Sequence, residues 1–205
     1  MSFVDAPANY KTPKMIADYI KKSGKENGFK VTVYDEKECL EKGFHALLAV
    51  GKGSIENPAK MVVMEYTSKN ADVKKVGLVG KGVTFDTGGV SLKPGSGMED
   101  MKMDMGGSAA VIGTMELAAK LKSNVHLIGI VALTENLIDS LAIKPGDVIN
   151  SYSGKTIEVI NTDAEGRLIL ADAVHLMATK YEPEVMIDLA TLTGSCIRTL
   201  GHVAA

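Results

Sequence analysis

The densest cluster of ionisable side chains lies between Asn161 and Arg167, in the sequence Asn-Thr-Asp-Ala-Glu-Gly-Arg. Two carboxylates and a guanidinium fall within five residues, at a predicted junction between a strand and a helix. Carboxylate oxygens can coordinate metal ions. A structural alternative stays open, because Thr162 and Glu165 match the capping-box pattern and acidic side chains favour a helix N-terminus.

A second segment, from Gly80 to Gly89, carries Lys81 and Asp86. It follows a short apolar strand, which is where α/β folds place ligand sites. It is not a phosphate-binding loop, because Lys75 stands where that motif has its first glycine. It is not a dinucleotide fingerprint either, because Phe85 stands at the third glycine position. The structural alternative is a turn in which the Asp86 side chain caps its own backbone.

A third group lies between Ser91 and Gly107. Lys93 belongs to Ser-Leu-Lys-Pro, and Asp104 belongs to Met-Lys-Met-Asp-Met-Gly-Gly, just before a predicted helix. The structural alternative for Asp104 is a helix N-cap. Methionines this dense suit either core packing or an adaptable apolar pocket. They are Met98, Met101, Met103 and Met105.

Each structural alternative is plausible singly, but the acidic residues form a set. Four of them lie at or near predicted strand-to-helix junctions, which an α/β sheet can gather at one edge: Asp86, Asp104, Asp163 and Glu165. Four carboxylates in one site repel each other and raise each other's pKa, and two divalent cations would neutralise them. Oxygen donors suit Mg²⁺ and Mn²⁺, and zinc accepts them as well.

Histidine does not occur in any of these segments, so a histidine-based zinc site is not expected. The histidines are expected to be packing or surface residues: His45, His126, His175 and His202.

The elements that must position these side chains follow from hydrophobic periodicity. Strands are expected at 30–34, 46–50, 61–66, 76–79, 125–133 and 185–189, the last of them buried, with a hairpin around 153–155. Helices are expected at 13–27, 36–42, 106–122, 166–180 and from residue 193. Residues 80–105 have no clear period, which is typical of a functional segment. The alternation predicts one partial α/β domain over residues 1–205, whose mostly parallel mixed sheet has helices on both faces.

Composition narrows the function classes. The formal net charge is −2, and no basic run is interleaved with aromatic residues, so nucleic acid is not an expected partner. No signal peptide and no apolar run of about 18 residues is present, which favours a cytoplasmic protein that does not cross a membrane. Cys39 and Cys196 are expected to be reduced, buried thiols.

Four motifs together resemble the leucine aminopeptidase (cytosol aminopeptidase) family. They are Gly-Lys-Gly-Val-Thr-Phe-Asp-Thr-Gly-Gly, Ser-Leu-Lys-Pro, Met-Lys-Met-Asp-Met-Gly-Gly and Asn-Thr-Asp-Ala-Glu-Gly-Arg. Their order and spacing resemble the family pattern without a gap. The resemblance extends to residues 5–9, 51–54 and 190–194, and so covers essentially the whole chain.

The resemblance implies two divalent cations, Mn²⁺ or Zn²⁺, with Mg²⁺ as a further option. Asp86 and Glu165 would bridge the two cations, and Asp163 would complete the tighter site. Lys81 and Asp104 would complete the more exchangeable site. Lys81 would have to be neutral to coordinate a cation, and a neighbouring dication lowers a lysine pKa in that direction.

The resemblance also implies roles outside the cation sites. Lys93 would stabilise the oxyanion that forms on the substrate carbonyl. Arg167 would hold a bicarbonate ion that acts as general base. Met101, Thr191 and Gly194 would line the pocket for the first side chain.

The implied activity is hydrolysis of N-terminal residues from peptides, with a preference for leucine and other apolar residues. Family members are hexamers built as dimers of trimers, so a homo-oligomer is expected. They normally carry a separate domain before the position of Met1 and more catalytic domain after Ala205, so the C-terminal part of the domain is expected to be missing here. Two alternatives stay open: a catalytically inactive fragment or assembly module that retains the fold, and a magnesium-dependent phosphoryl-transfer enzyme. The latter is disfavoured because no phosphate-binding loop is present.

Overall fold

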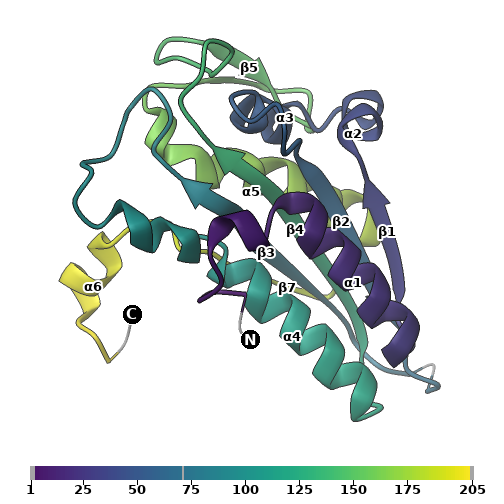
Figure 1. Cartoon of the computed structure of the whole chain (residues 1–205). Helices are drawn as coiled ribbons and strands as arrows, with labels where there is room; N and C mark the ends of the chain where they lie inside the picture. Colours follow the sequence, from purple (N-terminus) through teal and green to yellow (C-terminus); the bar gives the residue numbers. More distant parts are fainter. Residues whose placement is uncertain (1–2, 71, 204–205) are drawn as a thin grey trace.

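A five-stranded mixed sheet forms the centre of the structure, a computed structural model that describes residues 3–70 and 72–203 (Figure 1). Its strands, in spatial order, are β1 (Lys30–Tyr34), β2 (Lys60–Tyr66), β4 (His126–Asn136), β3 (Lys75–Asp86) and β7 (Val185–Leu189). β3 runs parallel to β4 and β7, whereas β2 runs antiparallel to β1 and β4. The α/β fold expected from the alternation of strands and helices is therefore confirmed.

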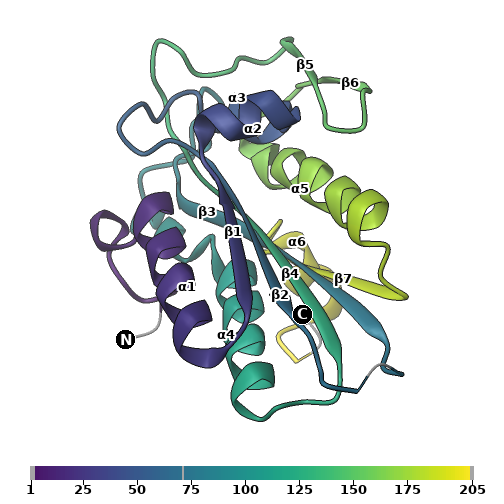
Figure 2. The same cartoon turned by 90° about the vertical axis from the view of Figure 1, so that its right-hand side faces the viewer.

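Helices cover both faces of this sheet (Figure 2). One face carries α1 (Pro13–Asn27) and α4 (Gly106–Lys120), and the other carries α2 (Glu36–Lys42), α3 (His45–Gly51) and α5 (Glu165–Leu176). Side chains of β2 alternate between the two cores, since Met61 packs with the α3 and α5 face while Val62 packs with the α1 and α4 face. Because both faces are covered, the strand reads as a continuous apolar run.

Shorter elements connect this framework. They are η1 (Ala8–Tyr10), η2 (Met98–Met103), η3 (Thr162–Ala164), the π-helical turn η4 (Met177–Tyr181), α6 (Ser195–Leu200) and a hairpin of β5 (Val148–Asn150) and β6 (Thr156–Glu158). η2 leads into α4, and η3 leads directly into α5. The predicted hairpin is confirmed. Within the described ranges, no helix is both long and apolar enough to cross a lipid bilayer.

The ends of α1 follow the signals in its sequence. The Thr12 hydroxyl accepts a hydrogen bond from the amide of Met15, and Pro13 occupies the first helical position. Gly28 ends the helix in the left-handed conformation, with φ at 84°. A side chain at that φ is strained, which explains why glycine ends the helix.

The predicted strand at 46–50 is wrong, because these residues lie in the helix α3. A short apolar run does not distinguish a strand from a buried helix. Here the run contains mainly alanine and leucine, which favour helix over strand. Leu47 and Val50 are buried in the core between α3 and the sheet.

The strand expected at 76–79 is much longer than predicted, because β3 continues to Asp86. Glycines at positions 77, 80 and 82 hide the strand in the sequence, since they break its apolar pattern. They also permit close packing. A Cβ on Gly80 would lie 2.7 Å from the Cα of Ser108 in α4, so a larger residue would push the helix away.

The C-terminal elements are more exposed than the sequence predicts. β7 was expected to be buried, but Val185, Met186 and Ile187 are 42 %, 39 % and 49 % exposed. The reason is that β7 is an edge strand, which pairs with β3 alone among the described residues. Cys39 is buried as expected, and burial raises its pKa to about 12. Cys196 is exposed, contrary to expectation, because α6 lies on the surface.

The contact between α4 and β7 depends on Gly107. A Cβ at this position would lie 1.9 Å from the carbonyl oxygen of Leu189, a backbone atom that cannot move without displacing the strand. Gly107→Ala should therefore lower the free energy of unfolding by about 1–3 kcal/mol through overpacking. Urea unfolding followed by circular dichroism measures this change.

The matched control is Gly113→Ala in the same helix, where a Cβ would meet no atom within 4 Å. This change should be neutral or stabilise the protein by about 0.5–1 kcal/mol, because alanine favours helix more than glycine does. Equal effects of the two substitutions would contradict the close contact at Gly107.

Candidate metal centre

The carboxyl ends of two parallel strands bring the site together. β3 ends at Asp86 and β4 ends at Asn136, and these two residues are paired across the strands. The register shifts between Val83 and Asp86, so the end of β3 is irregular. Asp104 and Glu165 reach the same edge from the starts of α4 and α5. The sheet edge predicted to hold the ligand site is therefore where the acidic residues meet.

Three carboxylates form the centre of the site. One carboxylate oxygen from each of Asp86, Asp104 and Glu165 lies within 4.8 Å of the other two. Their residues are only 1 %, 6 % and 1 % exposed. Buried carboxylates at this separation repel each other strongly unless positive charge lies between them. The arrangement therefore needs positive charge beside it or protonation of a carboxylate.

Lys81 supplies part of that positive charge. Its Nζ lies 2.7 Å from a carboxylate oxygen of Asp104 and 2.8 Å from one of Glu165. It also donates a hydrogen bond to the carbonyl oxygen of Thr191 at 2.9 Å. The lysine stem passes close to the start of α5, where a Cβ on Gly166 would lie 2.8 Å from Cε of Lys81. A glycine at this position leaves the room that the buried lysine needs.

Lys93 supplies the second positive charge. Its Nζ lies 3.0 Å from Asp86 and 2.5 Å from Asp163, so it links Asp163 to the buried cluster. Its side chain is 21 % exposed, whereas that of Lys81 is 3 % exposed. Lys93 is thus the lysine of the pair that solvent reaches.

The pKa values of the cluster are shifted mainly by burial, and the neighbouring charges modify these shifts. Burial raises the pKa of Glu165 to about 7; Lys81 opposes this shift, and Asp86 adds to it. Burial also raises the pKa of Asp104, again opposed by Lys81. Burial alone would lower the pKa of Lys81, but Glu165 and Asp104 outweigh it and raise that pKa above the ordinary value. Lys81 is therefore charged in this arrangement.

The donor set fits divalent cations. Four carboxylates and two ammonium groups leave two formal negative charges when all are ionised. Oxygen Oε2 of Glu165 is buried and has neither a hydrogen bond nor an ion pair with any residue in 3–70 or 72–203. Such an oxygen is costly to bury without a partner, and a cation would satisfy it. Carboxylate oxygens suit Mg²⁺, Mn²⁺ and Zn²⁺.

Of the three structural alternatives that the sequence left open for these motifs, two are wrong and one is confirmed. The capping-box interpretation of Thr162 and Glu165 is wrong, because the Thr162 hydroxyl donates to the carbonyl oxygen of Gly88 and the Glu165 carboxylate pairs with Lys81. Asp104 does not cap α4 with its side chain, which pairs with Lys81 instead. The turn at Asp86 is confirmed, since Asp86 Oδ1 accepts the amide of Gly88 at 2.8 Å.

Asn136 is a site residue that sequence reasoning missed. Its side-chain amide donates to Asp86 Oδ1 at 2.8 Å and to the carbonyl oxygen of Thr162 at 3.1 Å. It therefore orients the Asp86 carboxylate, a candidate metal ligand, and links β4 to η3 before α5. A polar residue at the carboxyl end of an apolar strand is the signal that would have pointed to it.

The remaining predicted site residues differ in their contact with the carboxylates. The Thr191 hydroxyl donates to Asp104 at 2.7 Å, so this residue touches the cluster. Met101 is half-buried in η2, three residues before Asp104. Gly194 is exposed at the start of α6. Arg167 is exposed on the first turn of α5, and its side chain makes no hydrogen bond or ion pair with the described residues.

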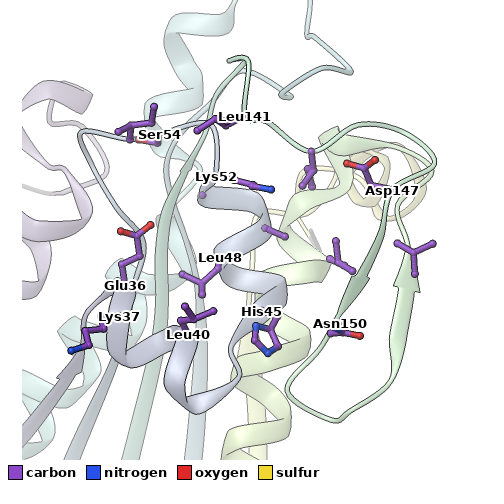
Figure 3. A pocket seen from close by; sticks show the side chains of 16 residues that line it. Glu36, Lys37, Leu40, His45, Leu48, Lys52, Ser54, Leu141, Asp147 and Asn150 are labelled. Atoms are coloured by element: carbon purple, nitrogen blue, oxygen red, sulfur yellow. The ribbon is translucent and has the colours of Figure 1, made fainter.

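The histidines take no part in this cluster within the described ranges, as expected. His126 accepts a hydrogen bond from the amide of Ser68, and the ring of His175 packs edge-on against Tyr152. His45 lies in a separate open groove of about 860 Å³, between α2, α3 and the segment that leads to β5 (Figure 3). None of the carboxylates of the site lines that groove, so it is not part of the candidate metal centre.

Family membership follows from comparison of the whole chain with known proteins. The model of the cytosol aminopeptidase family, catalytic domain, matches residues 1–205. The chain belongs to this family. The motifs that resembled it in the sequence are the ones that meet at the carboxylate cluster.

Relatives in the cytosol aminopeptidase family are similar along nearly the whole chain. A probable cytosol aminopeptidase of Geobacter sp. (strain M21) is 52 % identical over 202 residues, which cover 98 % of this chain and 41 % of the relative. One from Wolbachia pipientis wMel is 50 % identical over 201 residues, 98 % of this chain and 40 % of the relative. The chain thus spans about 40 % of the length of these relatives.

Solved structures agree with this assignment. Leucyl aminopeptidase from Trypanosoma brucei, in complex with actinonin, superposes with a TM-score of 0.94 at 41 % identity, over 97 % of this chain and 39 % of that one. The bottromycin maturation enzyme BotP, in complex with Mn, superposes with a TM-score of 0.91 at 38 % identity, over 97 % of this chain and 43 % of that one.

The raised pKa of Glu165 predicts how the metal-free protein responds to pH. The folded protein holds this proton up to about pH 7, whereas the unfolded chain releases it near the ordinary value of 4.5, so stability falls as pH rises between these values. Glu165→Gln removes the titration. In chelator, the stability of Glu165→Gln relative to wild type should therefore rise by on the order of 2 kcal/mol from pH 5 to pH 8.

Urea unfolding at several pH values measures this difference. Glu158→Gln, at an exposed position in β6, is the control and should track wild type at every pH. A Glu165→Gln curve that runs parallel to wild type would show that the pKa of Glu165 is not raised in the folded protein.

Proposed function

We propose that this chain carries the catalytic centre of a metal-dependent aminopeptidase that removes N-terminal residues from peptides, with leucine and other apolar residues preferred. The observation that supports this most is the buried set of Asp86, Asp104 and Glu165, whose carboxylate oxygens lie within 4.8 Å of one another. Family membership supplies the reaction class. The manganese complex of BotP supports a divalent cation.

In this proposal the cluster holds two cations, Mn²⁺ or Zn²⁺ or alternatively Mg²⁺. When bound, such a pair lowers the pKa of a shared water and polarises the scissile carbonyl. Asp86 and Glu165 would bridge the pair, and the otherwise unpartnered Oε2 of Glu165 is available for this role. Asp163 would complete the tighter site, while Lys81 and Asp104 would complete the more exchangeable one. Lys81 would have to coordinate as the neutral amine, which a neighbouring dication favours by lowering its pKa.

Lys93 and Arg167 act on the substrate side of the cluster. Lys93 stays charged, because its ion pairs with Asp163 and Asp86 raise its pKa in opposition to the effect of burial. Its partly exposed ammonium can therefore donate to the oxygen that gains negative charge on the substrate carbonyl. The exposed guanidinium of Arg167 has no carboxylate partner among the described residues, which leaves it available for a bicarbonate ion.

The first side chain of the substrate lies against Met101, Thr191 and Gly194 in this proposal. The flexible thioether of Met101 accommodates apolar side chains of different shapes. Thr191 is linked to Asp104 by its hydroxyl and to Lys81 by its carbonyl, so this wall is tied directly to the cation ligands. The preference for apolar residues in this proposal is supported by the side chains themselves, since Met101, Thr191 and Gly194 carry no charge.

A second candidate function is a module that retains the fold without catalysis. The observation that favours it is the exposure of β7, which leads to the segment with Thr191 and Gly194. A pocket wall that follows an exposed strand is stabilised by few packing contacts. Metal binding without turnover would favour this second candidate.

The setting of the activity is also a proposal. The name of the relatives, cytosol aminopeptidase, supports a cytoplasmic location and peptide substrates. Assembly into a homo-oligomer, with a hexamer as in the full-length family, stays a prediction.

Loss of one bridging carboxylate should abolish activity. Asp86→Asn should lower kcat/KM for leucine 4-nitroanilide in the presence of Mn²⁺ by more than about 100-fold, because loss of an outer-shell partner alone costs 10- to 100-fold. The release of 4-nitroaniline measures the rate. Asp100→Asn, at an exposed position in η2, is the control and should keep wild-type activity. Unchanged turnover by Asp86→Asn would overturn the assignment.

Cation binding should stabilise the folded chain. At a Mn²⁺ concentration 100-fold above Kd, the gain is about 2.7 kcal/mol, which raises Tm by roughly 5–10 °C for a chain of this size. Differential scanning calorimetry with and without chelator measures the shift. Glu165→Gln should lose most of it. An identical Tm in Mn²⁺ and in chelator would argue against a cation site.

A further inference from the structure

Lys11 is a fully buried lysine that the proposed chemistry does not use. Its side chain is 0 % exposed, although lysine is almost never buried without a partner. It follows η1 and lies just before α1, far along the chain from the carboxylate cluster. A buried ammonium with no role in catalysis calls for a structural reason.

Three backbone carbonyls satisfy the Lys11 ammonium. Its Nζ donates to the carbonyl oxygens of Phe3 at 2.6 Å, Val4 at 3.2 Å and Lys102 at 2.5 Å. An ammonium has three donors, so three acceptors use all of them. Burial lowers the pKa of Lys11 to about 8, with Lys102 adding to this effect and Asp5 opposing it. The geometry of the three bonds favours the charged form in spite of that burial.

The contact with Lys102 has a particular consequence for η2. This 3-10 helix has no buried residue, and its N-cap Gly97 makes no side-chain capping bond. Among residues 3–70 and 72–203, the bond from Lys11 is the one hydrogen bond that joins η2 to a segment distant in the sequence. The other hydrogen bonds of η2 are local to its own turn.

η2 also carries residues of the proposed site. Met101 lies immediately before Lys102, and Asp104 follows two residues later. The amide of Asp104 donates to the carbonyl oxygen of Met101, so the position of this turn sets both residues together. A shift of η2 would move the pocket methionine and the carboxylate that pairs with Lys81.

We propose that Lys11 is a positioning residue, which clamps η2 to the N-terminal segment and thereby sets where Met101 and Asp104 lie. The roles of Met101 and Asp104 in this inference rest on the proposed function. The clamp itself rests only on the three hydrogen bonds and on the absence of other long-range hydrogen bonds from η2 in the described residues.

Amide hydrogen exchange tests the clamp without any need for activity. Lys11→Met replaces the stem of the lysine side chain but removes every donor, and Lys11→Gln, which is shorter than lysine and is a neutral donor, serves if the methionine variant does not fold. Exchange at residues 98–104 should be at least 10-fold faster in either variant than in wild type, while α5 and the sheet keep wild-type rates. Lys14→Met is the control, because Lys14 is exposed and its ion pair is with Asp18 in the same helix.

Two further readouts test the effect on the site. Kd for Mn²⁺ by titration calorimetry should rise at least 5-fold in Lys11→Met. The ratio of kcat/KM for leucine 4-nitroanilide to that for alanine 4-nitroanilide should fall at least 5-fold, mainly through KM. If wild type cleaves neither amide, the proposed function fails, and hydrogen exchange together with Mn²⁺ affinity still decides the role of Lys11.

Three results would contradict the proposed role of Lys11. Wild-type exchange at 98–104 in the folded variant would overturn the clamp. Acceleration spread evenly over all elements would also overturn it, because it would mean that Lys11 stabilises the whole fold and not η2. Faster exchange with unchanged Mn²⁺ affinity and unchanged selectivity would overturn the positioning role.

Discussion

The clustering of three buried carboxylates and the partly exposed Asp163 around two lysine ammonium groups is the constraint that shapes this chain. Lys81 and Lys93 hold Asp86, Asp104, Asp163 and Glu165 together, yet negative charge remains in excess, and the pKa of Glu165 rises to about 7. Such a cluster opposes folding unless cations or protons neutralise it. The surrounding fold must therefore supply enough apolar burial to offset its cost, and the two cores on either side of the sheet do so.

Backbone geometry makes room for this cluster. The stem of Lys81 needs Gly166 beside it, and α4 approaches the sheet closely because Gly80 and Gly107 have no side chains. Gly80, one of the glycines that obscure β3 in the sequence, is therefore also one that lets α4 pack closely against the sheet. Hydrogen bonds then orient the carboxylates that could bind a cation. The side-chain amide of Asn136 in β4 donates to Asp86 at the end of β3 and to the carbonyl oxygen of Thr162 in η3.

Sequence reasoning predicted the acidic residues because their position at the ends of strands and starts of helices is visible in periodicity. It missed Asn136, because the predicted strand ended at residue 133 with the apolar run, whereas β4 continues to Asn136. The capping-box prediction for Thr162 was wrong because a threonine hydroxyl can either cap a helix or, as here, donate to a distant backbone carbonyl, and the sequence does not distinguish the two. Lys11 could not be predicted at all, because one of its carbonyl partners lies 91 residues away and lysine is normally exposed. The helix at 46–50 shows the same limit for short apolar runs.

The exposed strand β7 has a consequence for how this chain behaves at high concentration. No strand among the described residues pairs with its outer edge, which is flanked by the apolar side chains of Val185, Met186 and Ile187. An edge of this kind is a template for pairing with any other extended segment, including that of a second molecule. Asp188 is the single charge within the strand that opposes such pairing. How strongly molecules of this chain associate with one another at high concentration therefore depends on what covers the five residues of β7.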